Sequence, residues 1–266
     1  MVFRKVNYSC SGSVFTKHIL ILFLIITGSH AADPLVQNDT FWKDMSGNPI
    51  FSQGGGVFKF EDTWYWYGVR YAGAQTYYDN PVKKVSGGVF HSVTCYSSRD
   101  LVNWKFENDI LFAKAGGMLD PSSWIGRLGM AYNKNTGKYV LVAQCYGTPN
   151  TNQLFATCDS PNGKFTVDHL QATIENVVNG SPGDQTVFVD DDGKAYLVLS
   201  SRSGRANTYV APLRESDFLA VEPATKVFGG AGREGNCMFK YNGRYYVCSS
   251  DLHGWNASCC YFYRGC

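Results

Sequence analysis

The stretch GAGREGNCMFKYNGRYYVCSS, residues 230–250, contains the pattern that decides the fold. Apolar runs lie on either side of an Asn242-Gly243 dipeptide. An Asn-Gly pair between two strand-like runs favours a β-hairpin with a two-residue turn. Because Glu234 precedes the first run, the stretch predicts a hairpin with a carboxylate at its entrance.

The same hairpin recurs along the chain. Each copy has an apolar strand, a turn containing Gly or Asp, and a second strand that carries a tyrosine: Tyr65, Tyr139, Tyr196 and Tyr246. Several short strands repeating at roughly 50 residues are typical of a β-propeller. Since no stretch shows a sustained helical period, the expected fold class is all-β.

The first 31 residues read as a secretory signal peptide. Arg4 and Lys5 precede an apolar run at residues 19–26, and Ser29 and Ala31 supply the small residues of a cleavage site. The run is shorter than the roughly 20 residues of a membrane span. The predicted division is therefore a signal peptide at 1–31, a partial propeller at 32–256 and an aberrant tail at 257–266, in a secreted, extracellular protein.

Composition excludes one class of partner. The formal net charge is only +2, and no basic stripe marks a nucleic-acid surface. The chain is instead rich in aromatic residues and glycine, with 17 Tyr, 17 Phe, 6 Trp and 28 Gly, a composition that indicates a globular, turn-rich and β-rich protein. We expect a monomer with no nucleic-acid partner and no membrane span.

Eight of the nine cysteines lie beyond the signal peptide. Cys237 and Cys248 are equidistant from the Asn242-Gly243 turn, so a two-residue loop would set them opposite one another, about 5.5 Å apart at Cα. That separation is within disulfide reach. Two small buried core residues would give the same spacing, and both interpretations stay open.

Four phrases together resemble glycoside hydrolase family 43, in its exo-β-1,3-galactanase branch, over about residues 40–256. They are QGGGVFK with DTWYWYG (53–59 and 62–68), SRDLVNW (98–104), GDQTVFVDDDGKAY (183–196), and REGNCMFK (233–240) with Gly254-Trp255. The resemblance implies a five-bladed β-propeller. This chain would hold about three and a half blades, as a C-terminally truncated member.

Asp184 and Glu234 occupy equivalent places before the first strands of the third and fourth repeats, so they should converge at one end of a propeller channel. Two neighbouring carboxylates cannot both ionise freely, so one has its pKa raised. A glycosidase needs such a protonated acid. The resemblance implies that Glu234 is the general acid and that Asp184 holds and tunes it.

Two positions depart from the family pattern. Gly54 stands where most members carry the Asp that activates water, and the galactanase branch, which also lacks it, is thought to use an amide from a later blade. Gly126-Arg127-Leu128 stands where that branch carries Glu-Arg-Pro. The expected activity is exo-hydrolysis of β-1,3-galactan with inversion. Alternatives are an arabinofuranosidase or xylosidase, or an inactive, carbohydrate-binding propeller.

An oligo- or polysaccharide is the expected ligand. Candidate substrate-binding residues are Gln53, Tyr67, Trp124, Arg233 and Trp255. Calcium occupies the channel of some family members, but no acidic cluster here demands it, and Asp190, Asp191 and Asp192 read as a solvated turn. We therefore expect no metal or other cofactor.

Overall fold

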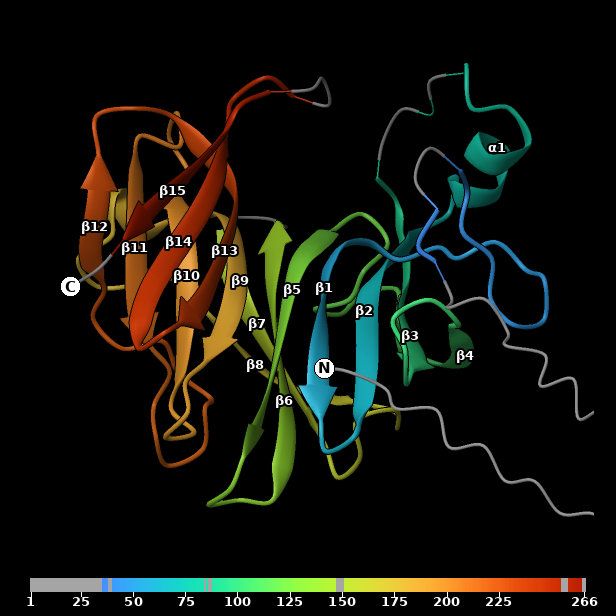
Figure 1. Cartoon of the computed structure of the whole chain (residues 1–266), viewed down its shortest axis with the longest axis horizontal. Helices are drawn as coiled ribbons and strands as arrows, with labels where there is room; N and C mark the ends of the chain where they lie inside the picture. Colours follow the sequence, from blue (N-terminus) through green and yellow to red (C-terminus); the bar gives the residue numbers. More distant parts are fainter. Residues whose placement is uncertain are drawn as a thin grey trace, which may run out of the picture. The chain divides into compact units, whose positions relative to one another are not determined.

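Alternating apolar residues separated by tight turns fold this chain into antiparallel sheets (Figure 1). The computed structural model describes residues 35–37, 40–83, 85, 88–146, 151–254 and 258–264. The predicted signal peptide and Trp255 lie outside the described residues. Within the described part, no helix has the length and apolar character needed to cross a membrane.

Each sheet is a meander in which consecutive strands pair. The first sheet contains β1 (Gln53–Phe60), β2 (Thr63–Tyr71), β3 (Phe90–Ser98) and β4 (Lys105–Phe112). The second contains β5 (Trp124–Asn133), β6 (Lys138–Tyr146), β7 (Thr151–Cys158) and β8 (Thr166–Gln171). The third contains β9 (Pro182–Val189), β10 (Ala195–Ser201), β11 (Asn207–Pro212) and β12 (Thr225–Gly229). The fourth contains β13 (Arg233–Tyr241), β14 (Arg244–Asp251) and β15 (Cys260–Arg264).

The first strands of the four sheets lie next to one another, β1 beside β5, β5 beside β9 and β9 beside β13. Later strands of each sheet lie progressively farther out (Figure 1). This arrangement is a β-propeller, with four blades among the described residues, and it confirms the all-β propeller prediction. The fifth blade stays a prediction. Short helices, α1 (Ala74–Asp79) and η1 (Val178–Gly180), lie in connections.

The core consists of two layers, each between neighbouring blades. One layer joins blades one and two, and its fully buried members include Tyr67, Val93, Ile110, Ile125, Met130 and Leu154. The other joins blades two and three and includes Val140, Val142, Phe155, Leu197 and Tyr209. Burying each such side chain contributes about 1.5–3 kcal/mol. A blade therefore depends on its neighbour for most of its stability.

The repeated tyrosines lie on the second strand of each blade, as the hairpin pattern predicted. Each is directly opposite an aromatic residue of the first strand: Phe58 with Tyr65, Tyr132 with Tyr139, Phe188 with Tyr196, and Phe239 with Tyr246. The last pair stacks with ring centroids 5.1 Å apart. Such cross-strand pairs stabilise the hairpin and fix its register.

The fourth blade continues beyond residue 256, where the sequence analysis ended the propeller. β15 pairs with β14, and the Tyr263 ring stacks on Phe228 of blade three at 4.3 Å. The run CYFYR contains three consecutive aromatic residues, a residue type that favours strands, which explains why residues 260–264 can extend the sheet. The part expected to be an aberrant tail thus supplies the third strand of the blade.

Gly129 of β5 lies directly against Val187 of β9. A β-carbon at residue 129 would lie 2.7 Å from the backbone nitrogen of Val187. We expect Gly129→Ala to lower the free energy of unfolding by about 1–3 kcal/mol, because the backbone must shift to admit a methyl group. Urea denaturation followed by Trp fluorescence measures the effect. Gly117→Ala is the control, since its nearest neighbour is 3.7 Å away. Equal midpoints for the two variants would contradict this account of the packing.

Candidate functional site

The first strand of every blade contains a β-bulge at the same end. In blade one, Gln53 pairs with Val69 and Gly56 with Tyr67, so β1 carries one residue more than β2. Equivalent register shifts lie between Gly126 and Gly129 in β5 and between Glu234 and Cys237 in β13. In β9 the shift falls between Pro182 and Gln185. Because bulges re-aim side chains, this ring of four bulges marks a site.

Three of the bulges contain a residue in the left-handed backbone region. Gly54 has φ 63°, Gly235 has φ 62°, and Arg127 adopts φ 50° although it has a side chain. Gly suits this conformation, and an Arg adopts it only when its surroundings hold it there. The Arg127 side chain is held by the ion pair with Asp184.

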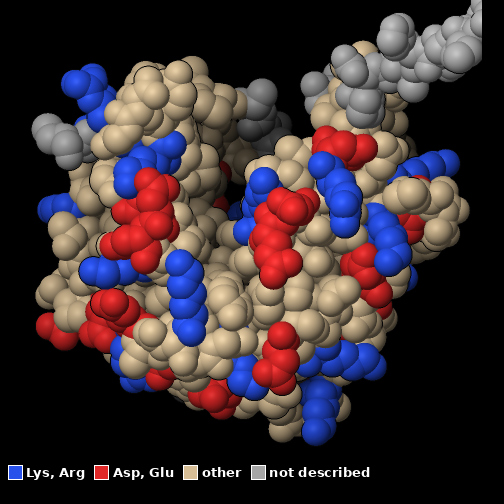
Figure 2. Space-filling view, turned by 60° about the horizontal axis from the view of Figure 1, so that its bottom comes forward, with Lys and Arg blue, Asp and Glu red and all other residues tan. Residues whose placement is uncertain are grey.

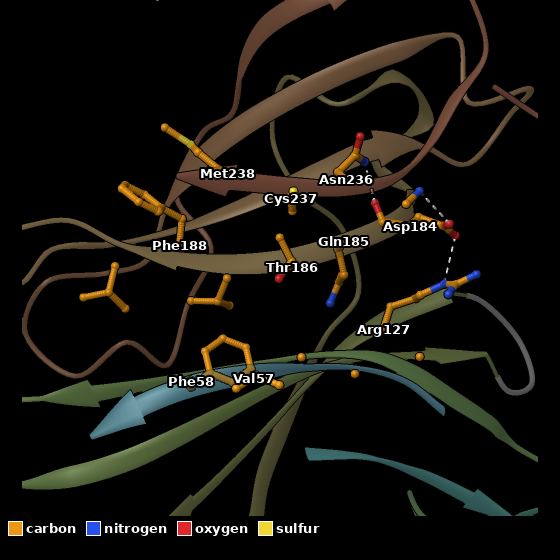
Figure 3. Close-up of a pocket in the computed structure, with 16 residues that line it drawn as sticks. Val57, Phe58, Arg127, Asp184, Gln185, Thr186, Phe188, Asn236, Cys237 and Met238 are labelled. Atoms are coloured by element: carbon orange, nitrogen blue, oxygen red, sulfur yellow. Dashed lines mark hydrogen bonds and ion pairs between the residues drawn. The ribbon is translucent and has the colours of Figure 1, made fainter. Parts of the chain in front are cut away.

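Asp184 lies in the bulge of β9 and is almost completely buried. Its carboxylate accepts the backbone N–H of Gly235 at 3.2 Å and pairs with Arg127 Nε at 3.2 Å (Figure 3). Arg205 donates to the same carboxylate at 3.4 Å. A buried carboxylate requires such partners, and here they come from blades two, three and four.

Two buried amides hold the backbone on either side of Asp184. Gln144 of β6 donates to the carbonyls of Pro182 and Gly183 at 2.8 and 2.7 Å. Asn236 of β13 donates to the Asp184 carbonyl at 3.2 Å and to Ser200 Oγ at 2.7 Å. These contacts fix the Asp184 backbone from the second and fourth blades, so the carboxylate position is set by the fold.

A cavity of about 430 Å³ lies between the four first strands. Its polar end is formed by Arg127, Asp184 and Asn236, and its other end includes Val57 and Met238 (Figure 3). The volume is within the range of small-ligand pockets. In Figure 2 acidic and basic side chains are interspersed on the face shown, around a hollow between two parts of the molecule. A small polar ligand fits this setting better than a polyanion.

Glu234 is the residue immediately before Gly235, whose N–H contacts Asp184. Its own carbonyl accepts the Ser250 hydroxyl at 3.2 Å, and its side chain is half-buried. The structure therefore places Glu234 and Asp184 in adjacent bulges, linked through the Gly235 N–H, whereas the described residues that line the cavity include Asp184 and not Glu234. Gln53, also half-buried, begins the bulge of β1 beside Gly54.

The remaining predicted contacts lie in different settings. Tyr67 is fully buried between blades one and two, where its hydroxyl donates to the Pro161 carbonyl at 2.7 Å, so it packs the core. Arg233 donates to the Tyr263 hydroxyl at 3.0 Å, pairs with Asp251 and lies over the Tyr261 ring. Arg233 thus holds β15 to the fourth blade.

Trp124 begins β5, three residues before Arg127. Its indole covers Gly126, where an added β-carbon would lie 2.6 Å from the ring, and it packs against Tyr146 at 4.8 Å. Burial raises the pKa of Tyr146, whereas Arg205 and Arg202 lower it. The Arg202 guanidinium lies 4.6 Å from the Tyr146 ring centroid. The Trp124–Tyr146 pair therefore lies beside Arg205, one of the two arginines that contact Asp184.

The donor set does not form a metal centre among the described residues. No group of three His, Cys, Asp or Glu side chains is close enough there to hold an ion. At the polar end of the cavity, Asp184 is engaged by two guanidinium groups. Cationic partners compete with a metal for the carboxylate, so calcium has no evident place beside this residue.

Sequence reasoning missed four residues that position Asp184: Arg127, Gln144, Arg205 and Asn236. Asn236 is inside the stretch that carries Glu234, and Arg127 is inside a phrase already compared with the family, so their positions were available as signals. Gln144 lies in β6 and Arg205 in the turn between β10 and β11, in other parts of the chain. Only the folded arrangement brings them to the carboxylate.

Comparison with known proteins decides the family. The family model described as "Glycosyl hydrolases family 43" matches residues 47–262. The chain belongs to this family. A comparison with curated proteins gives no match. Among solved structures, an exo-β-1,3-galactanase from Clostridium thermocellum is 28% identical with a TM-score of 0.70, covering 86% of this chain and 49% of that one.

A second solved structure is similar in the same way. The exo-β-1,3-galactanase from Phanerochaete chrysosporium, solved with galactose, is 26% identical, with a TM-score of 0.73. The match covers 85% of this chain and 50% of that protein. This family 43 chain thus spans about half the length of the two galactanases compared. An α-L-arabinofuranosidase from Clostridium thermocellum, 20% identical with a TM-score of 0.53, shares the fold.

The ion pairs of Asp184 predict a stability effect. We expect Asp184→Asn to lower the free energy of unfolding by about 1–3 kcal/mol, because two partly buried guanidinium groups lose their charged partner. Asp192→Asn is a matched control, since its carboxylate is 55% exposed and 3.9 Å from Lys194. Urea denaturation compares the two variants. Equal unfolding free energies for the two variants would contradict a stabilising role for the Asp184 contacts.

Proposed function

We propose that this chain is the propeller region of a secreted glycoside hydrolase that removes galactose from the ends of β-1,3-linked galactan, with inversion. One observation carries the proposal: Asp184 is fixed by three blades beside the peptide that follows Glu234, at the polar end of a cavity. The two similar solved structures, both exo-β-1,3-galactanases, support the substrate class. The basic and apolar pattern of residues 1–31 supports secretion.

In the proposed reaction Glu234 donates a proton to the glycosidic oxygen as the bond to the leaving sugar breaks. Asp184 accepts the Gly235 N–H and so fixes the backbone that carries Glu234. Arg127 spans the space between Asp184 and Gly54, since a β-carbon at Gly54 would lie 3.7 Å from its guanidinium. An exo-enzyme binds a single terminal sugar, and the cavity of about 430 Å³ is of a size to receive one. A fifth blade would complete the ring between β13 and β1.

A second candidate is a carbohydrate-binding propeller without turnover. The observation that favours it is Gly54, which has no side chain to activate water, together with the Arg127 guanidinium beside it. A further alternative is a glycosidase that acts on arabinose- or xylose-containing glycans. It is raised because Gly126 stands where the galactanase branch carries an acidic residue. Calorimetry with β-1,3-galactobiose, a hydrolysis assay and a panel of nitrophenyl glycosides distinguish the three, and NMR of the released anomer reads inversion.

The general-acid role predicts the effect of one amide substitution. We expect Glu234→Gln to reduce galactose release by about 10²–10⁴-fold while the protein still binds β-1,3-galactobiose, because the amide cannot deliver the proton. Glu215→Gln is the control, because its carboxylate is 71% exposed and Glu215 is not among the described residues that line the cavity. Rates are measured by galactose quantification. Galactose release by the Glu234→Gln variant at the unsubstituted rate would show that Glu234 is not the general acid.

The aromatic pair beside Arg205 predicts a binding effect. We expect Trp124→Ala to weaken binding of β-1,3-galactobiose about tenfold, since an indole face contributes stacking area for a sugar ring. Trp64→Ala is the control, because Trp64 lies near the opposite end of blade one with Lys59 over its ring. Calorimetry compares the two. Equal affinities would exclude Trp124 from the subsite.

A further inference from the structure

Three cysteines share one face of the fourth blade. Cys237 of β13 lies directly opposite Cys248 of β14. Cys260 of β15 lies opposite Ser250, two residues along β14 from Cys248, and therefore on the same face. Each is a free thiol in this structure, so the face holds a potential site of thiol oxidation.

The register singles out one pair. Cys237 and Cys248 belong to a hairpin closed by Asn242 and Gly243, whose φ values of 48° and 72° are those of a type I′ turn. Directly opposite residues are about 5.5 Å apart at Cα in a hydrogen-bonded pair, which a disulfide can span. Cys260 is diagonal to Cys248, and diagonal neighbours are about 7–8 Å apart, at or beyond that limit.

The pair also differs in access from the two thiols buried in the core. Cys95 and Cys145 are buried in the core, where burial raises the pKa of the Cys145 thiol to about 11. Cys237 is exposed and Cys248 is half-buried. Cys237 also lines the cavity (Figure 3). A dissolved oxidant can therefore reach the hairpin pair but not the two core cysteines.

The location gives the pair a consequence for the site. Cys237 and Cys248 form the first regular pair after the bulge that contains Gly235 and Asn236. Both bulge residues contact Asp184. A covalent link at this level would hold β13 to β14 immediately below the bulge and restrict its opening.

We propose that Cys237 and Cys248 form a cross-strand disulfide, closed by exchange with a low-molecular-weight disulfide such as oxidised glutathione, that clamps the bulge of the fourth blade. One protein thiolate attacks a sulfur of the small disulfide and expels one thiol, forming a mixed disulfide. The second protein thiolate attacks the protein sulfur of that bond and expels a second thiol. The pair loses two electrons and two protons, which the two released thiols carry away.

Peptide mapping of the full chain tests the linkage without any activity assay. The protein is incubated with oxidised glutathione, alkylated with N-ethylmaleimide and digested with trypsin without reduction. We expect peptide 234–240, which contains Cys237, joined to peptide 245–264, which contains Cys248, Cys259 and Cys260. The joined species should persist in a Cys259→Ser, Cys260→Ser double variant and disappear in Cys248→Ser. Alkylated Cys237 after oxidation, or a joined species that survives Cys248→Ser, overturns the proposal.

Thermal unfolding provides a second readout on the unmodified sequence. Reduction with dithiothreitol should lower the midpoint of the oxidised protein by about 5 °C, because the open chain regains conformational freedom when unfolded. Cys248→Ser, which cannot form the bond, should show no shift on reduction. Equal shifts in both proteins contradict a disulfide clamp. Neither readout depends on hydrolysis, so this inference and the proposed function can fail separately.

Discussion

The Asp184 carboxylate is the contact on which the arrangement of the site depends. It belongs to blade three, pairs with Arg127 of blade two and accepts a backbone N–H from blade four. A buried carboxylate without such partners would be costly, so the three blades must meet in one relative position to satisfy it. The apolar layers hold neighbouring blades together, and this polar contact specifies their alignment at the cavity end.

Local patterns made much of the fold predictable from the sequence. Asn242-Gly243 determined a two-residue turn, and the turn set Cys237 opposite Cys248, as the structure has it. The recurring tyrosines located the second strand of each blade because their opposite partners are aromatic too. In each case the cause is local: turn geometry and strand alternation act over a few residues.

The remaining features depend on contacts that are distant in the sequence. Tyr67 reads as a pocket aromatic, yet its hydroxyl meets Pro161 across the blade interface and its ring is fully buried. Arg233 reads as a sugar contact, but Tyr263 and Asp251 engage it. Neither environment can be seen in a single stretch. The bulges could not be predicted either, because one extra residue in a strand looks like an ordinary irregularity in the alternation of apolar and polar residues.

The bulges place residues of the site outside the regular pairs of the strands. Residues inside a bulge have no regular partner in the neighbouring strand, so exchanging them leaves the pairing below intact. Arg127 illustrates this, because it lies between the paired residues Gly126 and Gly129 and its side chain reaches Asp184. A substitution inside a bulge can therefore change which side chain faces the cavity while the regular pairs next to it keep the two strands together.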